Sequence, residues 1–472
     1  MASIDSLATP QERTLRRKLS AMMFLQFFIW GAWFELGFDY IPKLGFNNDW
    51  QLPLIFGAFN VGALVALFFS TQFADRKFAA EKFVAFSHLI GGLAILGLFF
   101  IRKEPGVESA PFWPFFLLML LHSIFYVPTI SITNSIAFAN LKDPAREFGP
   151  VRVWGTIGWI AASWPFIFIL VDWANVPKFG DVGFVKWLEA ALGTSVTGEA
   201  ALDLKRYIFL VAGLGSLALA AFSLTLPHTP PKPATTGSDS LAWLKAMRLL
   251  RHPFVAVLFL VTFIDAAVHQ SFFFWTFTFL GPKVDGGVVD IPANWVGPVM
   301  KIGQIAEIVT MLFLGYVLKR FGWRTTMVVG VLGHAARFAV FTYYPHQDAA
   351  ILINALHGIC YAFFFATVYI FVDEFFPKDV RSSAQGLFNV LILGVGPFAA
   401  NFMCGRLKDQ YGFTTLMGHK TVETVEYPGV FVYSMGAALL GAVILLLFFH
   451  PPKEKLTEVP GTSAEENAPP VA

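Results

Sequence analysis

Charged residues are scarce in this sequence, and their scarcity indicates the class of protein. Of its 472 residues only 14% are Asp, Glu, Lys or Arg, while 56% are hydrophobic and the mean hydropathy is +0.61. Soluble domains carry about a quarter charged residues. The low charge therefore predicts that lipid, rather than water, is the main solvent of the chain. The formal net charge of +2, with no basic arm or stripe, excludes nucleic acid as an expected partner.

Other absences exclude most enzymes. The chain has two cysteines, Cys360 and Cys404, and both fall in apolar runs, so we expect reduced packing residues rather than a disulfide. It has no Gly-x-x-x-x-Gly-Lys-Ser/Thr phosphate loop, no Cys/His spacing for a metal or haem, and no Gly-x-Ser-x-Gly elbow. We therefore expect no catalysis, no cofactor and no metal. Any energy source must be an ion gradient, or the movement of solute is passive.

The sequence does contain a series of apolar runs of about 20 residues, the length at which a helix crosses a bilayer. Residues 227–251, rich in Pro and Thr, separate the sixth run from the seventh as a predicted cytoplasmic linker. We expect an all-α integral membrane protein with two six-helix bundles, residues 20–226 and 252–450. Residues 1–19 are a predicted N-terminal segment, and 451–472 a disordered tail. The twelve predicted spans are 20–42, 52–72, 83–101, 112–138, 150–171, 207–226, 252–280, 293–318, 325–345, 348–372, 382–405 and 428–450.

The basic residues predict the orientation of the spans. Most of the 34 Lys and Arg residues fall in connections that share one side with the N-terminus. The positive-inside rule then places both termini in the cytoplasm. A monomer is the default expectation.

Several polar side chains lie inside the predicted spans, where a charge costs about 2.5–3.5 kcal/mol and must face the bundle interior. In the eighth span Gln304 and Glu307 are three residues apart and share one helical face. In the seventh, Asp265 and His269 are four apart and able to pair, with Gln270 next to them. Each could line a cavity, and the alternative for each is a structural ion pair or a packing residue.

Two further spans carry polar residues. His357 and Tyr361 are four apart in the tenth span. In the first span Glu35 lies inside, while Asp39 is close to the outer end and is predicted at the membrane interface.

The stretch VRVWGTIGWI, residues 151–160, places a cation before an apolar run. Arg152, Thr156 and Trp159 follow one helical stripe, and Gly155 and Gly158 thin the adjoining surface for close approach. A guanidinium, a hydroxyl and a flat ring suit a polar, ring-bearing solute such as a nucleoside. Alternatively, Arg152 extends to the membrane boundary and binds nothing.

Several stretches together carry a family resemblance. With its two predicted six-helix halves, the chain resembles the major facilitator superfamily and, more narrowly, bacterial nucleoside:proton symporters. The combination of Arg-x-Trp-Gly-Thr-Ile-Gly with Gln-x-x-Glu is its most specific part. The stretches are FLQFFIWGAW (24–33), residues 128–135, VRVWGTIGWI (151–160), TLPHTP (225–230), GQIAE (303–307) and VRSSAQGLF (380–388).

The resemblance implies a set of nucleoside contacts. Carried over by position, they fall on Arg152, Thr156, Trp159, Gln270, Gln304 and Glu307. The chain also departs from the relatives: Trp159 replaces a Phe, Phe273 an Asn, and His357 and Tyr361 replace a Tyr and a Phe. Ala362 stands where the relatives carry an acid suited to proton coupling. These departures leave the base preference and the coupling mechanism open.

Our hypothesis is a secondary transporter that imports nucleosides with protons by alternating access. Trp159 and Phe273 would stack on the base, and the proton-coupling candidates are Glu307 and Asp265 with His269. The alternatives are transport of another polar solute (a sugar, a nucleobase or a cell-wall fragment) and a membrane-embedded sensor that binds without translocating.

Overall fold

The computed structural model describes residues 9–69, 79–231, 247–377, 381–417, 420–452 and 454–456. Most of the predicted linker 227–251 and nearly all of the predicted tail 451–472 lie outside these residues, as does the first part of the N-terminal segment.

The described chain is mostly helical, and its membrane-length segments follow the predicted spans. The first bundle contains α2 (Pro10–Tyr40), α3 (Gln51–Phe69), α5 (Ala80–Leu98), α6 (Phe112–Asn140), α7 (Pro144–Ala161) with α8 (Trp164–Ile169), and α12 (Tyr207–Ser223). The second contains α14 (Pro253–Leu280), α15 (Ala293–Met300), α16 (Ile302–Tyr343), α17 (Gln347–Ile353) to α19 (Thr367–Phe375), α20 (Arg381–Asn389), α21 (Gly396–Tyr411) and α22 (Tyr427–Phe448).

Nine described helices are long and apolar enough to cross a membrane. The other three of the twelve predicted spans are not found as separate long apolar helices in the described chain, and each for a physical reason. Ala293–Tyr343 contains two spans in succession, α3 is described as apolar over the shorter stretch Gln51–Val65, and α7 begins with charged residues. The two spans of α16 are separated at Gly322, whose φ of 76° only glycine adopts readily. The predicted break between 318 and 325 is confirmed.

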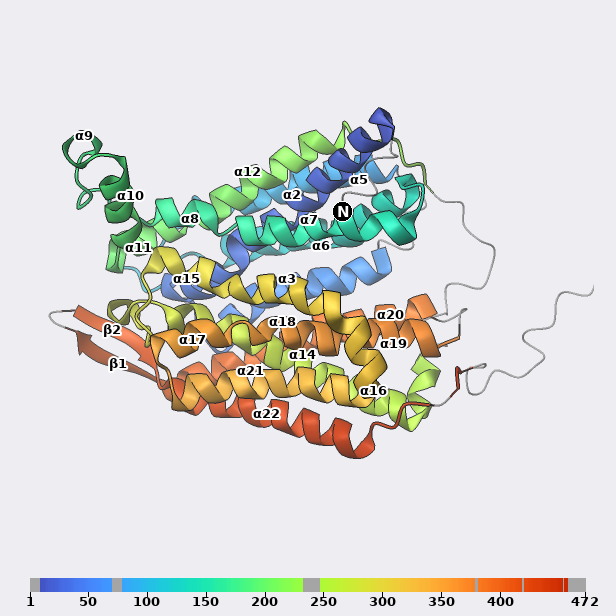
Figure 1. Cartoon of the computed structure of the whole chain (residues 1–472). Coiled ribbons are helices and arrows are strands. Elements are labelled where there is room, and N and C mark those ends of the chain that lie inside the picture. The colour runs from blue at the N-terminus through green and yellow to red at the C-terminus, as the bar shows by residue number, and fades with distance from the viewer. Residues whose placement is uncertain are drawn as a thin grey trace, which may run out of the picture.

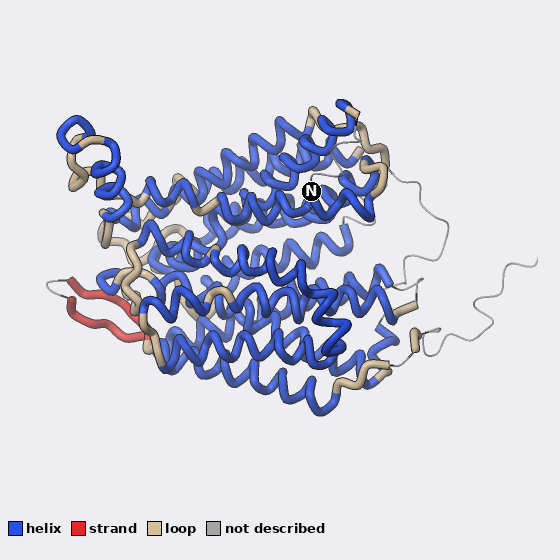
Figure 2. The backbone as a smooth tube through the Cα atoms, in the orientation of Figure 1, coloured by secondary structure: helices blue, strands red, loops and turns tan. Residues whose placement is uncertain are grey.

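Helices of each half pack mainly with one another. In the first half α2 packs on α7 and α12, and α5 on α6; in the second, α14 packs on α21 and α22, and α16 on α18 (Leu356–Cys360). The two halves meet along α2 with α14 and α3 with α21. Figure 1 shows them as two layers of roughly parallel helices, and the tube in Figure 2 places the loops at the two ends of these layers.

We name the two ends of the molecule by what they carry. At the terminal face α2 begins and α12 and α22 end, whereas the loop face carries the short helices α9 (Phe179–Val182), α10 (Phe184–Gly193) and α11 (Gly198–Lys205) (Figure 1). The loop face also carries a β-hairpin, in which β1 (Gly412–Met417) pairs with β2 (Lys420–Val425) in an antiparallel register. The sequence did not predict these additions, because they lie between the apolar runs.

Three local features refine the predicted helices. The first helix starts about ten residues before the predicted span, because Thr9 and Glu12 form a capping box around Pro10. The tenth and eleventh segments each contain a π-helical turn, at Tyr361–Ala366 and Val390–Val395. Such turns frequently mark functional sites. Both cysteines are free and buried, as predicted.

Candidate binding site

Arg152 lies in the interior between the two halves. Its guanidinium stacks over the Phe27 ring of α2 at 4.0 Å from the centroid. Glu307 of α16 and Tyr361 of the π-helical turn, both in the second half, lie near enough to influence its charge but beyond hydrogen-bond and ion-pair distance. Thr156 is half-buried one helical turn further along the same stripe. The structure therefore favours the interior position of Arg152 over extension to the membrane boundary.

Two glycines set how closely α7 approaches α2. A Cβ atom added to Gly158 would stand 2.1 Å from the Phe24 carbonyl oxygen, and one on Gly155 would stand 2.7 Å from the Phe27 ring. Both distances are too short for a real side chain. The close helix approach predicted from these glycines is confirmed, and it brings Arg152 against Phe27.

Trp159 lies within an aromatic cluster at the junction of the halves. Its ring meets Trp30 edge-on at 5.1 Å, and its indole Nε1 has no hydrogen-bond partner among the described residues. The Lys301 ammonium lies 4.7 Å from the centroid of the same ring and forms an ion pair with Glu35 at 2.8 Å. A flat ring with an unpartnered N–H is therefore held between α2 and the start of α16.

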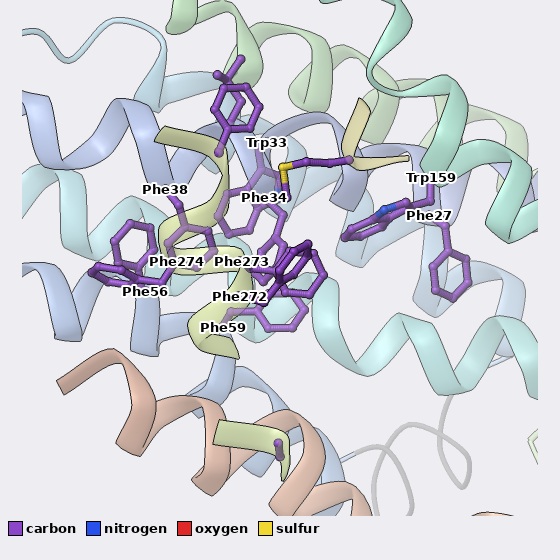
Figure 3. Close-up of a cluster of buried hydrophobic side chains, with 14 of the residues drawn as sticks. Phe27, Trp33, Phe34, Phe38, Phe56, Phe59, Trp159, Phe272, Phe273 and Phe274 are labelled. Carbon is purple, nitrogen blue, oxygen red and sulfur yellow. The ribbon is translucent and has the colours of Figure 1, made fainter. Parts of the chain in front are cut away.

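Phe273 brings the second half to the same cluster. It meets Phe34 of α2 edge-on at 5.3 Å between ring centroids, and His357 at 5.7 Å. Figure 3 shows Phe34, Phe273, Phe272 and Phe59 gathered between the helices of the two halves. An aromatic surface of this kind can accept a planar ring by stacking.

Close packing between α16 and α18 (Leu356–Cys360) positions Gln304 and Glu307, the polar pair of the eighth predicted span. A Cβ atom on Gly303 would stand 2.7 Å from His357 Cβ, and one on Gly358 would stand 2.3 Å from the Glu307 amide nitrogen. Gln304 Nε2 lies 3.3 Å from His357 Nε2, while half-buried Glu307 interacts with Arg152 across the junction. The two side chains thus face the same interior region as the α7 stripe.

Gln270 belongs to a chain of amides that crosses the junction. It donates to Asn401 Oδ1 of α21 at 2.9 Å, and Asn401 donates to Asn60 Oδ1 of α3 at 3.2 Å. Asn60 in turn donates to the Leu393 carbonyl at 2.8 Å. Neither asparagine is among the site residues predicted from the sequence, although an amide inside an apolar span is a usable signal.

The structure changes the interpretation of Asp265 and His269. Asp265 and His269 are one helical turn apart, but they do not pair. The basic side chain nearest to the Asp265 carboxylate is His334, whose Nε2 lies 3.7 Å from Oδ2. His269 instead stacks on His357, with ring centroids 5.0 Å apart, and its Nδ1 has no partner among the described residues. His334 and Arg337, one helical turn apart, are not among the site residues predicted from the sequence, although a cation inside the ninth span is a usable signal.

Asp39 lies at the end of α2, as the sequence predicts, and its side chain is only 3% exposed because it belongs to an ion-pair cluster. It pairs with Lys205 at 2.6 Å and with Lys43 at 2.8 Å, and it accepts a hydrogen bond from Thr278 of the second half at 2.9 Å. The lysines compensate the charge, so the acid can be buried.

Besides the amide chain through Asn60, several bonds between the halves lie on one side of this region. Trp295 Nε1 donates to the Leu192 carbonyl at 2.8 Å, and the Gly198 amide donates to Asp285 at 2.8 Å. Together with the Asp39 and Glu35 contacts, these lie between the junction and the loop face. The described halves are therefore joined at the loop face.

Comparison with known proteins agrees with this architecture. The family model described as "Nucleoside H+ symporter" matches residues 14–179 and 172–454. The putative nucleoside transporter YegT of Escherichia coli is 28% identical over 452 residues, covering 94% of this chain and 95% of that protein. The xanthosine permease of Escherichia coli is 27% identical over 453 residues, covering 92% and 96%.

A solved structure has the same fold. The crystal structure of nucleoside transporter NupG superposes with a TM-score of 0.72 at 23% identity, covering 92% of this chain and 99% of that one. This likeness confirms the predicted twelve-helix fold of the major facilitator type.

Proposed function

Because the chain belongs to the nucleoside H+ symporter family, we propose that it imports nucleosides across the bacterial cytoplasmic membrane together with protons. The observation that carries this proposal is that Arg152 of the first half stacks on Phe27 beside the aromatic cluster, with Glu307 of the second half near enough to influence it electrostatically, although the two form no ion pair in this structure. The family consists of transporters, so we assign the protein transport and no enzymatic reaction.

The bonding groups suit a nucleoside. Arg152 has a planar fork of donors, Glu307 accepts from ribose hydroxyls, and the amides of Gln270 and Gln304 can both donate and accept. Trp159 and Phe273 would stack on the base, with Thr156, His357 and Tyr361 completing the lining. Stacking on a ring is worth roughly 1–3 kcal/mol per base.

Transport would proceed by rocking of the two halves about this site. We place both termini in the cytoplasm, so the joined loop face would be the periplasmic side. Opening the loop face would separate Glu35 from Lys301 and Asp39 from Thr278. The solute would then enter between the halves.

Proton coupling requires a group whose proton affinity differs between the two states. Glu307 is one candidate, since its distance from Arg152 changes when the halves move. Asp265, with His269 one turn away, is the other. We take the protein to act as a monomer in the bilayer.

Counterflow exchange tests the substrate class. Purified protein in liposomes loaded with unlabelled nucleoside should take up labelled adenosine or uridine with equal pH on both sides, and protein-free liposomes should not. Unlabelled nucleosides should compete, whereas hexoses, nucleobases and cell-wall sugars should not. Counterflow uptake of a labelled sugar or nucleobase, without uptake of labelled nucleosides, would overturn the proposal in favour of another solute.

A further inference from the structure

Five polar side chains of the second half form a connected cluster between α14, α16 and α18, which we call the buried cluster: Asp265, His334, Arg337, His357 and Gln304. Each is at most 5% exposed. The cluster begins at Asp265, near the middle of α14, and ends at Gln304, which faces the candidate binding site.

The donors of Arg337 determine which nitrogen of each neighbouring histidine carries the proton. Arg337 lies within 2.8 Å of His334 Nδ1 and within 3.1 Å of His357 Nδ1. Because a guanidinium only donates, both Nδ1 atoms must accept, and each ring carries its proton on Nε2. His357 Nε2 is then a donor facing Gln304 Nε2 at 3.3 Å, so the Gln304 amide has to turn over and present its oxygen to that ring. The NH2 group of Gln304 is then left for a solute.

Asp265 is the unusual member of the cluster. Neither of its carboxylate oxygens has a hydrogen-bond partner among the described residues, because His334 Nε2 at 3.7 Å is beyond hydrogen-bond range. An ionised carboxylate without donors is costly to bury. The same carboxyl, once protonated, is neutral. Asp265 therefore occupies a position where binding a proton removes a large desolvation cost.

The elements packed on Asp265 supply few other charges. Its own helix contributes His269, α16 contributes His334 and Arg337, and α18 contributes His357 and Cys360. The neighbouring α21 and α22 carry no charged residue between positions 396 and 405 or between 428 and 448. Arg337 is thus the permanent charge that faces Asp265.

Arg337 is also incompletely compensated. It has no carboxylate within ion-pair distance among the described residues, its Nε lacks a partner there, and its guanidinium lies 3.6 Å from the Phe272 ring centroid. Its electrostatic interaction with Asp265 acts across His334. Neutralising Asp265 would leave Arg337 as an uncompensated buried cation.

We propose that Asp265, with His334 beside it, binds the transported proton, and that Arg337 and His357 transmit its charge state to Gln304 at the solute site. This inference rests on the proposed nucleoside symport and chooses between its two coupling candidates. Arg337 keeps its own protons throughout. The proton binds one Asp265 oxygen, and the hydrogen bonds from Arg337 to His357 then readjust. If protonation of Asp265 changes the affinity for a nucleoside held by Gln304, then by linkage nucleoside binding changes the proton affinity of Asp265 by the same factor.

Two comparisons within the molecule support this choice. In the first half, the buried His88 has partners for both nitrogens: Ser216 at 2.9 Å and Gln26 at 3.0 Å. That histidine is satisfied and structural, unlike the buried cluster. A metal site is also disfavoured, since no group of three metal-ligating side chains converges in the described part of the chain.

The test compares Asp265→Asn with Asp265→Glu and with Glu307→Gln in proteoliposomes. Asp265→Asn should keep counterflow exchange of labelled nucleoside but lose accumulation under an inward proton gradient, so that internal and external concentrations become equal. Asp265→Glu should restore accumulation. Glu307→Gln should weaken binding yet still accumulate nucleoside when it is saturating. Normal accumulation by Asp265→Asn would overturn the assignment, as would loss of accumulation confined to Glu307→Gln.

A second readout does not depend on nucleoside. An infrared pH titration of the substrate-free protein should show a protonated-carboxyl band that Asp265→Asn removes, that Asp265→Glu shifts, and that Glu307→Gln retains. If Asp265→Asn does not fold, the shift in Asp265→Glu still decides the question. A protonated-carboxyl band that neither Asp265→Asn nor Asp265→Glu removes or shifts would contradict the proposal. Failure of wild-type exchange with an intact infrared result would instead contradict the nucleoside assignment alone.

Discussion

At the scale of single residues, the candidate site combines a permanent cation with an acid from the opposite half. Arg152 is held by stacking on Phe27 and by the close α2–α7 packing at Gly158. The stacking restricts the guanidinium before any solute arrives, so less side-chain entropy remains to be lost on binding. A lysine at this position would keep the charge but lose the planar fork.

We predict that Arg152→Lys raises the KM for nucleoside exchange roughly tenfold or more, because a hydrogen bond to a charged group contributes about 1.5–3 kcal/mol. The matched control is Arg146→Lys on the same helix, whose exposed side chain pairs with Asp143 at 3.5 Å. Exchange kinetics in proteoliposomes would measure both. Equal KM values for the two variants would remove Arg152 from the site.

The sequence indicates some of these residues better than others. Arg152 and Glu307 stand out as site candidates because a charged side chain inside an apolar segment is costly and usually faces the bundle interior. The group nearest to Asp265 could not, since helical spacing points to His269, whereas the side chain that approaches it is His334 of α16. Spacing describes one helix face and carries no information about which helix packs against it.

At the scale of elements, glycines determine which helices approach closely. Gly158 has no room for a Cβ atom against Phe24, whereas a Cβ on Gly436 of α22 would meet nothing within 4 Å. Small residues of this kind allow helices to pack closely inside a bilayer.

Gly158→Ala should therefore lower the Tm of the detergent-purified protein, because overpacking typically costs about 1–3 kcal/mol. Gly436→Ala should leave the Tm unchanged or raise it, since glycine in a helix is roughly 0.5–1 kcal/mol less favourable than alanine. A thermal melt of the two variants side by side makes the comparison. The same Tm for both would show that α2 and α7 are not in close contact.

The element pair α2 and α16 is joined by the Glu35–Lys301 ion pair, with both side chains 3% exposed. Removing one partner of such a buried pair costs about 3–5 kcal/mol, whereas replacing both is often neutral. We expect Glu35→Gln and Lys301→Met each to lower the Tm, and the double variant to recover most of the loss. Additive losses in this double-mutant cycle would indicate that the two residues are independent.

At the scale of the whole molecule, hydropathy predicted the helices but not how they meet. Apolar run length fixes where a helix can cross the membrane, so the break near Gly322 and both ends of α14 were accessible from the sequence. The joined loop face was not, because it depends on contacts such as Asp39 with Thr278 that unite distant segments. The hairpin β1–β2 was missed for a related reason: it lies outside the apolar runs.

The central claim, proton-driven nucleoside import, is tested most directly by uptake of labelled adenosine and uridine into proteoliposomes with and without an inward proton gradient. We predict accumulation above the external concentration that requires the gradient and collapses when an uncoupler is added. Uptake that stops at equal concentrations regardless of the gradient, or no uptake by folded protein, would contradict the account.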